Sequence, residues 1–306
     1  MTKVKRNKVA LWGASLCAFG LVAGLAACAP QSATDAGGDA SATSNAKLPQ
    51  QEGTPAADEY GVVTAEAWKD VYPYQYSSYM ENEANSPDSG KHDYLELYPA
   101  LNTMYKGYAF ALGYDEASSH VYALQSVKET PRTTEKEQLA NCITCKTPQF
   151  TAKVNSEGDE VYTEKFNDMI GEFTEPISCY NCHENEPQSL SVTGQYFVKS
   201  LGSDYGETSE VPMESQVCGQ CHNEYYFDPD TKVTTNPYES TDGMTPDAIL
   251  AYYDERGYKD WEHADTLAPM IKVQHTEFET MYGGDMAPMA KQGYSCADCH
   301  MGTVEG

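Results

Sequence analysis

The sequence has few basic residues. Lys and Arg together number 20 against 46 Asp and Glu, which gives a formal net charge of -26. A protein that binds nucleic acid needs clustered Lys and Arg to displace the counterions of the phosphates, so the composition argues against a nucleic-acid partner. An anionic substrate would need a local group of cations in this chain, because the average field repels it.

Apolar residues are also sparse for a chain of 306 residues. Hydrophobic residues make up 40% of it, and the mean hydropathy is -0.58. The length allows one large domain or two small ones. Because side chains alone would give such a domain a thin interior, we expect a bound apolar cofactor to complete it.

Apolar residues gather near the N-terminus, from Ala10 to Ala27, after a basic segment that begins at Lys3. The stretch runs into "LAAC", which ends at Cys28 and matches a lipoprotein cleavage site. We expect a lipoprotein signal peptide over residues 1–27 and lipid attachment at Cys28. This predicts an exported protein, anchored by lipid on the periplasmic or extracytoplasmic face of the cell membrane. A short transmembrane anchor is the alternative interpretation.

Residues 28–58 are rich in Ala, Ser, Gly, Thr, Gln and Pro and have almost no large apolar side chains. This composition is typical of a flexible tether. We therefore expect the folded domain to span residues 59–306.

Histidine is scarce, with 7 residues, and most of the ten cysteines follow one pattern. Two cysteines lie in the N-terminal region, and the other eight form four Cys-X-X-Cys pairs. A histidine follows three of the pairs directly, and a lysine follows the first. The four motifs are Cys142, Cys145 and Lys146; Cys179, Cys182 and His183; Cys218, Cys221 and His222; and Cys296, Cys299 and His300.

This pattern favours covalent haem over two other uses of cysteine. A disulfide framework does not require histidine after the second cysteine. Zinc knuckles are usually separated by about 15–20 residues, and the gap after Cys145 is roughly twice that length. On a helical turn, by contrast, cysteines at i and i+3 and an iron ligand at i+4 share one face.

Four haem c groups would organise a fold that is mainly α, with little β-sheet. The start signals and spacing of Thr245 to Tyr258 predict a helix, whereas Thr231 to Asp242 has the composition of a loop.

Lys146 takes the place of the iron-binding histidine at one of the four sites. An amine must lose its proton before it can bind iron, and a metal cation favours this loss. An electron-transfer haem gains from two strong ligands, but a haem that performs chemistry needs an open face. We therefore expect the lysine-type haem to be the active site. The alternative is that Lys146 points to solvent and a distant histidine binds the iron.

These motifs resemble those of the ammonia-forming cytochrome c nitrite reductase family, over roughly Asp93 to Met301. The matching stretches are "NCITCK", "VCGQCHNEYYF", "PMIKVQHTEFET" and "CADCHM". In that family a Cys-X-X-Cys-Lys motif binds the catalytic haem. The resemblance implies reduction of nitrite to ammonium, with electrons from a membrane quinol-oxidising cytochrome or another donor.

The resemblance also implies a catalytic trio. Arg132 would hold the anion, and Tyr225 and His275 would assist proton transfer. Each residue has another interpretation: Arg132 could pair with a haem propionate, Tyr225 could pack on a haem, and His275 could be the distal ligand of a neighbouring haem.

Two further ligand sets follow from the same resemblance. A Ca²⁺ ion would be bound by Glu224, Gln274 and the backbone carbonyls of Tyr225 and Lys272, although these residues could also form a surface salt-bridge cluster. His120 would be the distal ligand of the haem held by the third motif. The remaining histidines, His92 and His263, receive no role.

Some features depart from the family. Ser118 and Ser119 stand where an Arg-Gly pair is common, the spacing from Arg132 to Cys142 is short, and the region around Met286 lacks a haem-binding histidine. A fifth haem motif and the family's dimer-forming C-terminal helices are also missing. We expect the complete reading frame to extend past Gly306, with a fifth haem and a homodimer only in the full-length protein. A non-catalytic electron carrier, and a reductase of hydroxylamine, sulfite or another small oxyanion, are the alternative functions.

Overall fold

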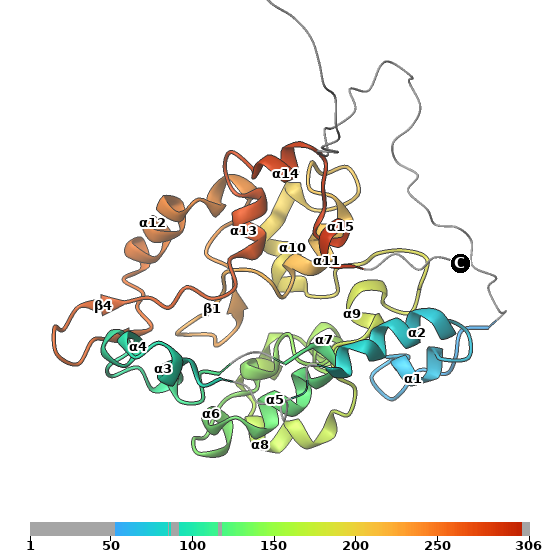
Figure 1. Cartoon of the computed structure of the whole chain (residues 1–306), viewed down its shortest axis with the longest axis horizontal. Helices are drawn as coiled ribbons and strands as arrows, with labels where there is room; N and C mark the ends of the chain where they lie inside the picture. Colours follow the sequence, from blue (N-terminus) through green and yellow to red (C-terminus); the bar gives the residue numbers. More distant parts are fainter. Residues whose placement is uncertain (1–52, 85, 87–91, 116–117, 302–306) are drawn as a thin grey trace, which may run out of the picture. The chain divides into compact units, whose positions relative to one another are not determined.

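The computed structural model describes residues 53–84, 86, 92–115 and 118–301. The expected signal peptide, Cys28 and most of the expected tether lie outside these residues. Within them the chain is mainly helical, with two small antiparallel sheets of two strands each (Figure 1). The expected fold class is confirmed.

The α-helices are numbered in chain order. They are α1 Ala65–Trp68, α2 Pro73–Met80, α3 Tyr94–Leu97, α4 Ala100–Met104, α5 Ala123–Glu129, α6 Pro131–Thr134, α7 Pro148–Glu157, α8 Phe166–Met169, α9 Cys179–His183, α10 Gln195–Leu201, α11 Met213–Gly219, α12 Pro246–Arg256, α13 Glu277–Tyr282, α14 Pro288–Lys291 and α15 Cys296–His300.

Short 3₁₀ helices and two hairpins connect these helices. The 3₁₀ helices are η1 Glu81–Ala84, η2 Ala109–Ala111, η3 His120–Tyr122, η4 Ala140–Ile143, η5 Asp159–Thr163, η6 Ile170–Glu172, η7 Gly202–Asp204 and η8 Thr241–Met244. The strands are β1 Tyr226–Phe227, β2 Thr234–Thr235, β3 Trp261–Glu262 and β4 Pro269–Met270. Strand β1 pairs with β2 and β3 pairs with β4.

Proline and capping side chains mark where several helices begin. Proline occupies one of the first two positions of α2, α6, α7, α12 and α14, where its missing N–H is not needed. Thr245 caps the predicted helix α12 by accepting from the N–H of Ala248 at 3.2 Å. The segment predicted as a loop, Thr231 to Asp242, is mostly irregular but contains β2 and the start of η8.

Two clusters of buried apolar side chains stabilise these short helices, which would be marginal alone. The first joins α5, α7, α8 and the segments between them: Leu124, Val127, Ala140, Ile143, Phe150, Val154, Val161, Tyr162, Phe166, Met169 and Phe173. The second joins α10, α11 and α13: Val192, Tyr196, Phe197, Leu201, Val211, Met213, Val217, Tyr238, Met244, Phe278 and Tyr282.

Helix α11 lies at the centre of the second cluster. It contacts α9, α13 and α15 (Figure 1), so the three helices that carry histidine-type motifs pack together. Among the described residues, no helix has the length and apolar character required to span a membrane.

Candidate active site

The three histidine-type motifs adopt the helical geometry that their spacing predicts. Helices α9 and α15 each begin at the first cysteine of a motif and end at its histidine. After α11 the helical pattern continues to His222, whose N–H donates to the carbonyl of Cys218 at 3.0 Å. Each motif therefore presents its two thiols and its imidazole on one turn.

The lysine-type motif does not follow this geometry, and the expectation of a helical turn is wrong there. The 3₁₀ helix η4 ends at Ile143, and Cys145 has a left-handed backbone with φ of 61°. A β-carbon disfavours this conformation, so the turn is specified by the packing around it. Helix α7 then begins at Pro148, and Lys146 lies half-buried in the reversal between the two elements.

One cysteine of each motif packs against the second core cluster: Cys145, Cys182, Cys218 and Cys296. Sγ of Cys145 donates to the carbonyl of Gln220 at 3.7 Å, so the first motif contacts the third between its two cysteines. The eight motif cysteines are all free thiols. Paired cysteines followed directly by a histidine or a lysine fit covalent haem.

His183 is oriented as an iron ligand would be. Its Nδ1 lies 2.8 Å from the carbonyl oxygen of Ser189. A carbonyl can only accept, so Nδ1 carries the proton and Nε2 keeps its lone pair for a metal.

His120 and His222 also have a separation that fits iron ligation. Their ring centroids lie 6.2 Å apart. Two imidazoles that share one metal ion need a similar separation, since each metal–nitrogen bond is about 2 Å long. Their distance thus fits the expected pairing at the third motif.

A second histidine lies near His222. The ring centroids of His222 and His275 are 5.9 Å apart, and Nδ1 of each lies within 4 Å of the same Glu277 carboxylate oxygen. The ligand atoms of these three exposed residues lie within 4.8 Å of one another. Both interpretations of His275, as a proton donor and as a neighbouring ligand, are therefore compatible with this geometry.

His263 has no ring nitrogen left for iron. It is 8% exposed, and its Nε2 donates to the carbonyl of Thr103 at 2.8 Å. Its Nδ1 accepts from the N–H groups of Asp265 and Thr266, each at 3.3 Å. Nδ1 thus stabilises the turn between β3 and β4, and Nε2 joins that turn to α4.

The expected catalytic residues lie within electrostatic range of the lysine-type motif. Burial raises the pKa of Tyr225, and the motif's two cysteines raise it further, whereas the guanidinium of Arg132 opposes the rise. Partial desolvation lowers the pKa of His275 although half of its side chain is exposed; the Glu277 carboxylate opposes this fall and the positive charge of Lys146 adds to it. Charges of the motif thus act on Tyr225, just before β1, and on His275, before α13, and the Arg132 charge from α6 acts on Cys142.

Lys272 adds a second cation beside Arg132. Burial lowers the pKa of Lys272 to about 8, and the Arg132 charge contributes in the same direction. Its ammonium donates to Oε1 of Gln274 at 3.1 Å. The two side chains lie close enough to repel each other.

The expected calcium ligands include a buried carboxylate, Glu224, which contacts a second expected ligand, Gln274. Glu224 is 1% exposed, and burial raises its pKa to about 7. Its carboxylate accepts from the hydroxyl of Tyr253 at 3.0 Å and from the N–H of Gln274. Glutamate, amide and backbone oxygens are the hard donors that Ca²⁺ prefers, so the residues present fit this ion.

Sequence motifs gave no signal for Asp260, a second acidic group near this set. Its Oδ2 accepts from the N–H of Lys272 at 2.6 Å, and its charge raises the pKa of Glu224. Only the pairing of β3 with β4 brings Asp260 next to the segment of Lys272.

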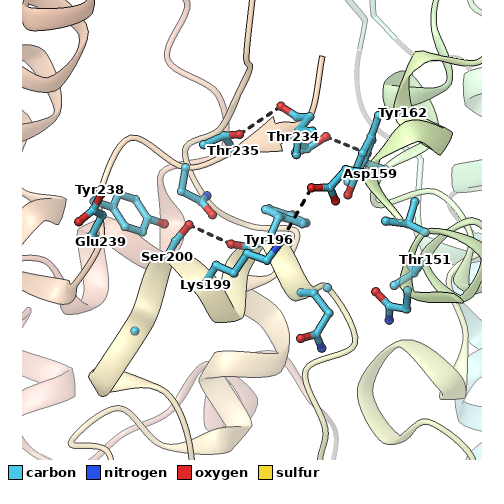
Figure 2. A pocket seen from close by; sticks show the side chains of 18 of the residues that line it. Thr151, Asp159, Tyr162, Tyr196, Lys199, Ser200, Thr234, Thr235, Tyr238 and Glu239 are labelled. Atoms are coloured by element: carbon cyan, nitrogen blue, oxygen red, sulfur yellow. Dashed lines mark hydrogen bonds and ion pairs between the residues drawn. The ribbon is translucent and has the colours of Figure 1, made fainter. Parts of the chain in front are cut away.

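Two cavities lie next to the segment of the lysine-type motif, one beside Cys142 and the other beside Thr144. One, of about 280 Å³, is bordered by Cys142 of the lysine-type motif and by Phe110, Phe227 and Lys232, among others. The other, of about 450 Å³, is lined mainly by hydroxyl and amide side chains and by the Lys199–Asp159 ion pair (Figure 2). None of the expected catalytic trio lines the larger cavity.

The comparisons with known proteins agree with these motifs. The family model for cytochrome c552 matches residues 64–306. Cytochrome c-552 of Parabacteroides distasonis is 35% identical over 248 residues, which are 75% of this chain and 49% of that protein. Cytochrome c-552 of Porphyromonas gingivalis is 33% identical over 77% of this chain and 50% of its own length.

A solved structure is also similar. It is the catalytic subunit of cytochrome c nitrite reductase from Desulfovibrio desulfuricans, described with two calcium sites; the TM-score is 0.68 and the identity 28%, over 81% of this chain and 60% of that one. The chain spans about half the length of the curated relatives it matches. With a family model that covers most of its length, the chain belongs to the cytochrome c552 family.

Proposed function

We propose that the protein is an exported multihaem c-type cytochrome that reduces nitrite to ammonium at a haem bound by the lysine-type motif. The observation that carries this proposal is the lysine in place of histidine at one of the four motifs, within electrostatic range of a guanidinium, a phenol and an imidazole. The similarity to a solved nitrite reductase supports the choice of substrate.

The proposed reaction takes up six electrons and eight protons for each nitrite and releases ammonium and two water molecules. Haem iron, when bound, supplies the electrons and an electrophilic centre for the nitrogen atom. Arg132 would hold the anion through charge-assisted hydrogen bonds. The Tyr225 hydroxyl and the His275 imidazole would deliver protons and be reprotonated from solvent.

Electrons would reach this site through the haems of the other three motifs. The contacts of α11 with α9 and α15, and of Cys145 with the carbonyl of Gln220 at 3.7 Å, support this route, because they join neighbouring motifs. We propose four haem c groups on this chain, which the mass of the intact holoprotein would test. A membrane quinol-oxidising cytochrome or another donor would supply the electrons.

The test is the yield of ammonium from nitrite with reduced methyl viologen, measured on the purified holoprotein. We expect six viologen radicals to be consumed for each ammonium formed. Lys146→His should keep its covalent haem but lower turnover at least tenfold, because the axial donor changes. A holoprotein that makes no ammonium and has only six-coordinate low-spin haem would be an electron carrier. Turnover of hydroxylamine or sulfite, without turnover of nitrite, would identify the protein as a reductase of that other substrate.

The role of His275 can be separated from that of His120 by their asparagine variants. His275→Asn should slow nitrite turnover and leave the low-spin haem spectrum intact. His120→Asn should remove one low-spin signal, since a distal ligand is lost. The opposite result would exchange the two roles.

The calcium proposal rests on the buried Glu224 carboxylate and the oxygen atoms around it. Glu224→Gln should weaken calcium binding by at least tenfold in equilibrium dialysis, because the proposed ligand set loses its carboxylate. Equal calcium content in both proteins would contradict the assignment.

Export and lipid anchoring rest on the N-terminal sequence alone. Cys28→Ala should remove lipid labelling and release the protein from the membrane fraction. Unmodified Cys28 in the mature membrane protein would overturn this proposal.

A further inference from the structure

Arg132 and Lys272 lie on one aromatic ring. The Cζ atom of Arg132 is 4.6 Å from the ring centroid of Phe110, and Nζ of Lys272 is 5.3 Å from the same centroid. Nζ of Lys272 is also 5.2 Å from the ring centroid of Tyr114. All three distances are within the range of a cation–π interaction, about 6 Å.

Neither cation is paired with a carboxylate within the described part of the chain. There, the side-chain hydrogen bonds of Arg132 and Lys272 go to neutral oxygens, Thr130 Oγ1 at 3.4 Å and Gln274 Oε1 at 3.1 Å. Acidic residues outnumber basic ones 46 to 20. The charges of Asp260 and Glu224 do act on Lys272 and raise its pKa against the effect of burial. Among the described residues, the two cations thus lie near carboxylates without forming an ion pair to one.

An aromatic ring is a suitable support for such cations. Its negative face attracts the charge without accepting a strong hydrogen bond. The N–H groups of the guanidinium and the ammonium thus stay available to an anion.

The backbone fixes the ring against Arg132. Gly113, three residues after Phe110, has φ of 68°, and a β-carbon there would lie 2.8 Å from Cδ of Pro131. Glycine therefore allows this loop to pack directly on the start of α6, one residue before Arg132. On the other side Phe110 contacts Tyr108, which stacks on Trp261 with ring centroids 4.1 Å apart.

We propose that Phe110 is a positioning residue that presents Arg132 and Lys272 together as one binding site for a small oxyanion. Phe110 also lines the 280 Å³ cavity that reaches Cys142 of the lysine-type motif. The ring itself links the anion site to that motif, because Arg132 and Lys272 do not line the cavity. The inference rests on the proposed function for its substrate, nitrite, and extends it to Phe110, which no motif identifies, and to the side chain of Lys272.

The test compares Phe110→Leu, which removes the ring, with Phe110→Tyr, which keeps it. For Phe110→Leu we expect KM and the nitrite dissociation constant, measured by absorbance titration of the oxidised holoprotein, to rise about tenfold, with kcat within about twofold. Phe110→Tyr should stay within about twofold of the parent protein. Binding of hydroxylamine, which is neutral at pH 7.5, should not change in either variant.

Coupling between residues gives a second readout. In a Lys272→Met background, Phe110→Leu should weaken nitrite binding by a clearly smaller factor than in the parent protein, because one of the two positioned cations is already gone. If Phe110→Leu does not accumulate, Phe110→Met serves in its place, because methionine fills irregular apolar gaps.

Two results would overturn the inference: nitrite binding that is unchanged in Phe110→Leu, or equal losses for nitrite and hydroxylamine, which would mean that the ring only fills space. Failure of the proposed function looks different. In that case the parent protein forms no ammonium from nitrite, while the titrations still measure whether Phe110 supports anion binding.

Discussion

Glu175 is a buried carboxyl group at the start of helix α1. It is 8% exposed, and its Oε1 accepts from the N–H of Ala65 at 2.7 Å. A negative charge at a helix N-terminus is favourable, but desolvation outweighs this effect and raises the pKa of Glu175 above its ordinary value of 4.5. The folded protein therefore holds a proton that the unfolded chain releases.

The raised pKa of Glu175 predicts a pH-dependent effect of Glu175→Gln. The folded state binds more protons than the unfolded state above about pH 4.5, so this group lowers stability as pH rises through its folded pKa. Glutamine keeps the acceptor for Ala65 without the charge. We expect the Tm of Glu175→Gln minus that of the parent protein to become more positive from pH 4.5 to pH 8.

Glu210→Gln, at an exposed carboxylate, is the matched control for this measurement. Its Tm difference should stay within about 1 °C at every pH, as is usual for surface substitutions. A flat difference for Glu175→Gln as well would show that Glu175 ionises freely in the folded protein.

Single residues also show what the sequence could and could not predict. The spacing of cysteine and histidine identified the candidate thiols and proximal ligands, because local geometry links i, i+3 and i+4. It could not show that Nε2 of His263 bonds to the carbonyl of Thr103, or that Phe110 lies against Arg132 and Lys272. Those contacts join segments far apart in the chain, and the sequence carries no local signal for them.

At the scale of elements, Gly219 controls how closely three helices pack. It is the last residue of α11, and a β-carbon there would lie 2.4 Å from Cδ2 of Phe278 and 2.7 Å from Cζ of Phe197. Both rings are fully buried. Neither ring can move without disturbing the second core cluster.

Gly219→Ala should therefore destabilise the protein. Alanine favours a helix over glycine by about 1 kcal/mol, but overpacking a core costs about 1–3 kcal/mol, and contacts this short place the cost at the upper end. We expect a net loss of about 1–2 kcal/mol and a Tm lower by about 2–8 °C in thermal denaturation of the holoprotein.

Gly171→Ala is a matched control, because a β-carbon at Gly171 has no neighbour within 4 Å. Its Tm should equal or slightly exceed that of the parent protein. A higher Tm for Gly219→Ala would mean that the rings of Phe197 and Phe278 adjust at little cost.

The elements differ in how well local sequence specifies them. Helix α12 was predictable because Thr245 and proline mark its start and Gly257 follows its end. The turn at Cys145 was not, since nothing in "NCITCK" requires a left-handed cysteine. Its conformation depends on packing of Cys145 against the second core cluster, whose residues lie about 50 or more positions further along the chain.

At the scale of the whole molecule, net charge and local charge act in opposite directions on an anionic substrate. The formal charge is -26, which repels nitrite at long range, whereas Arg132 and Lys272 attract it at short range. The Debye length is about 30 Å at 0.01 M salt and about 8 Å at 0.15 M. Added salt should thus screen the distant acidic residues more than the two cations beside the bound anion.

We therefore predict that kcat/KM for nitrite rises about two- to fivefold between 0.01 M and 0.15 M ionic strength. Potassium gluconate is a suitable salt, because its bulky anion competes poorly for a small site, and initial rates with reduced methyl viologen give the measurement. Hydroxylamine, neutral at pH 7.5, should show no comparable rise and so controls for effects of salt on electron delivery. A fall in kcat/KM for nitrite alone would mean that the local cations dominate the field along the whole approach, and that the surplus of acidic residues lies too far from the site to repel its substrate.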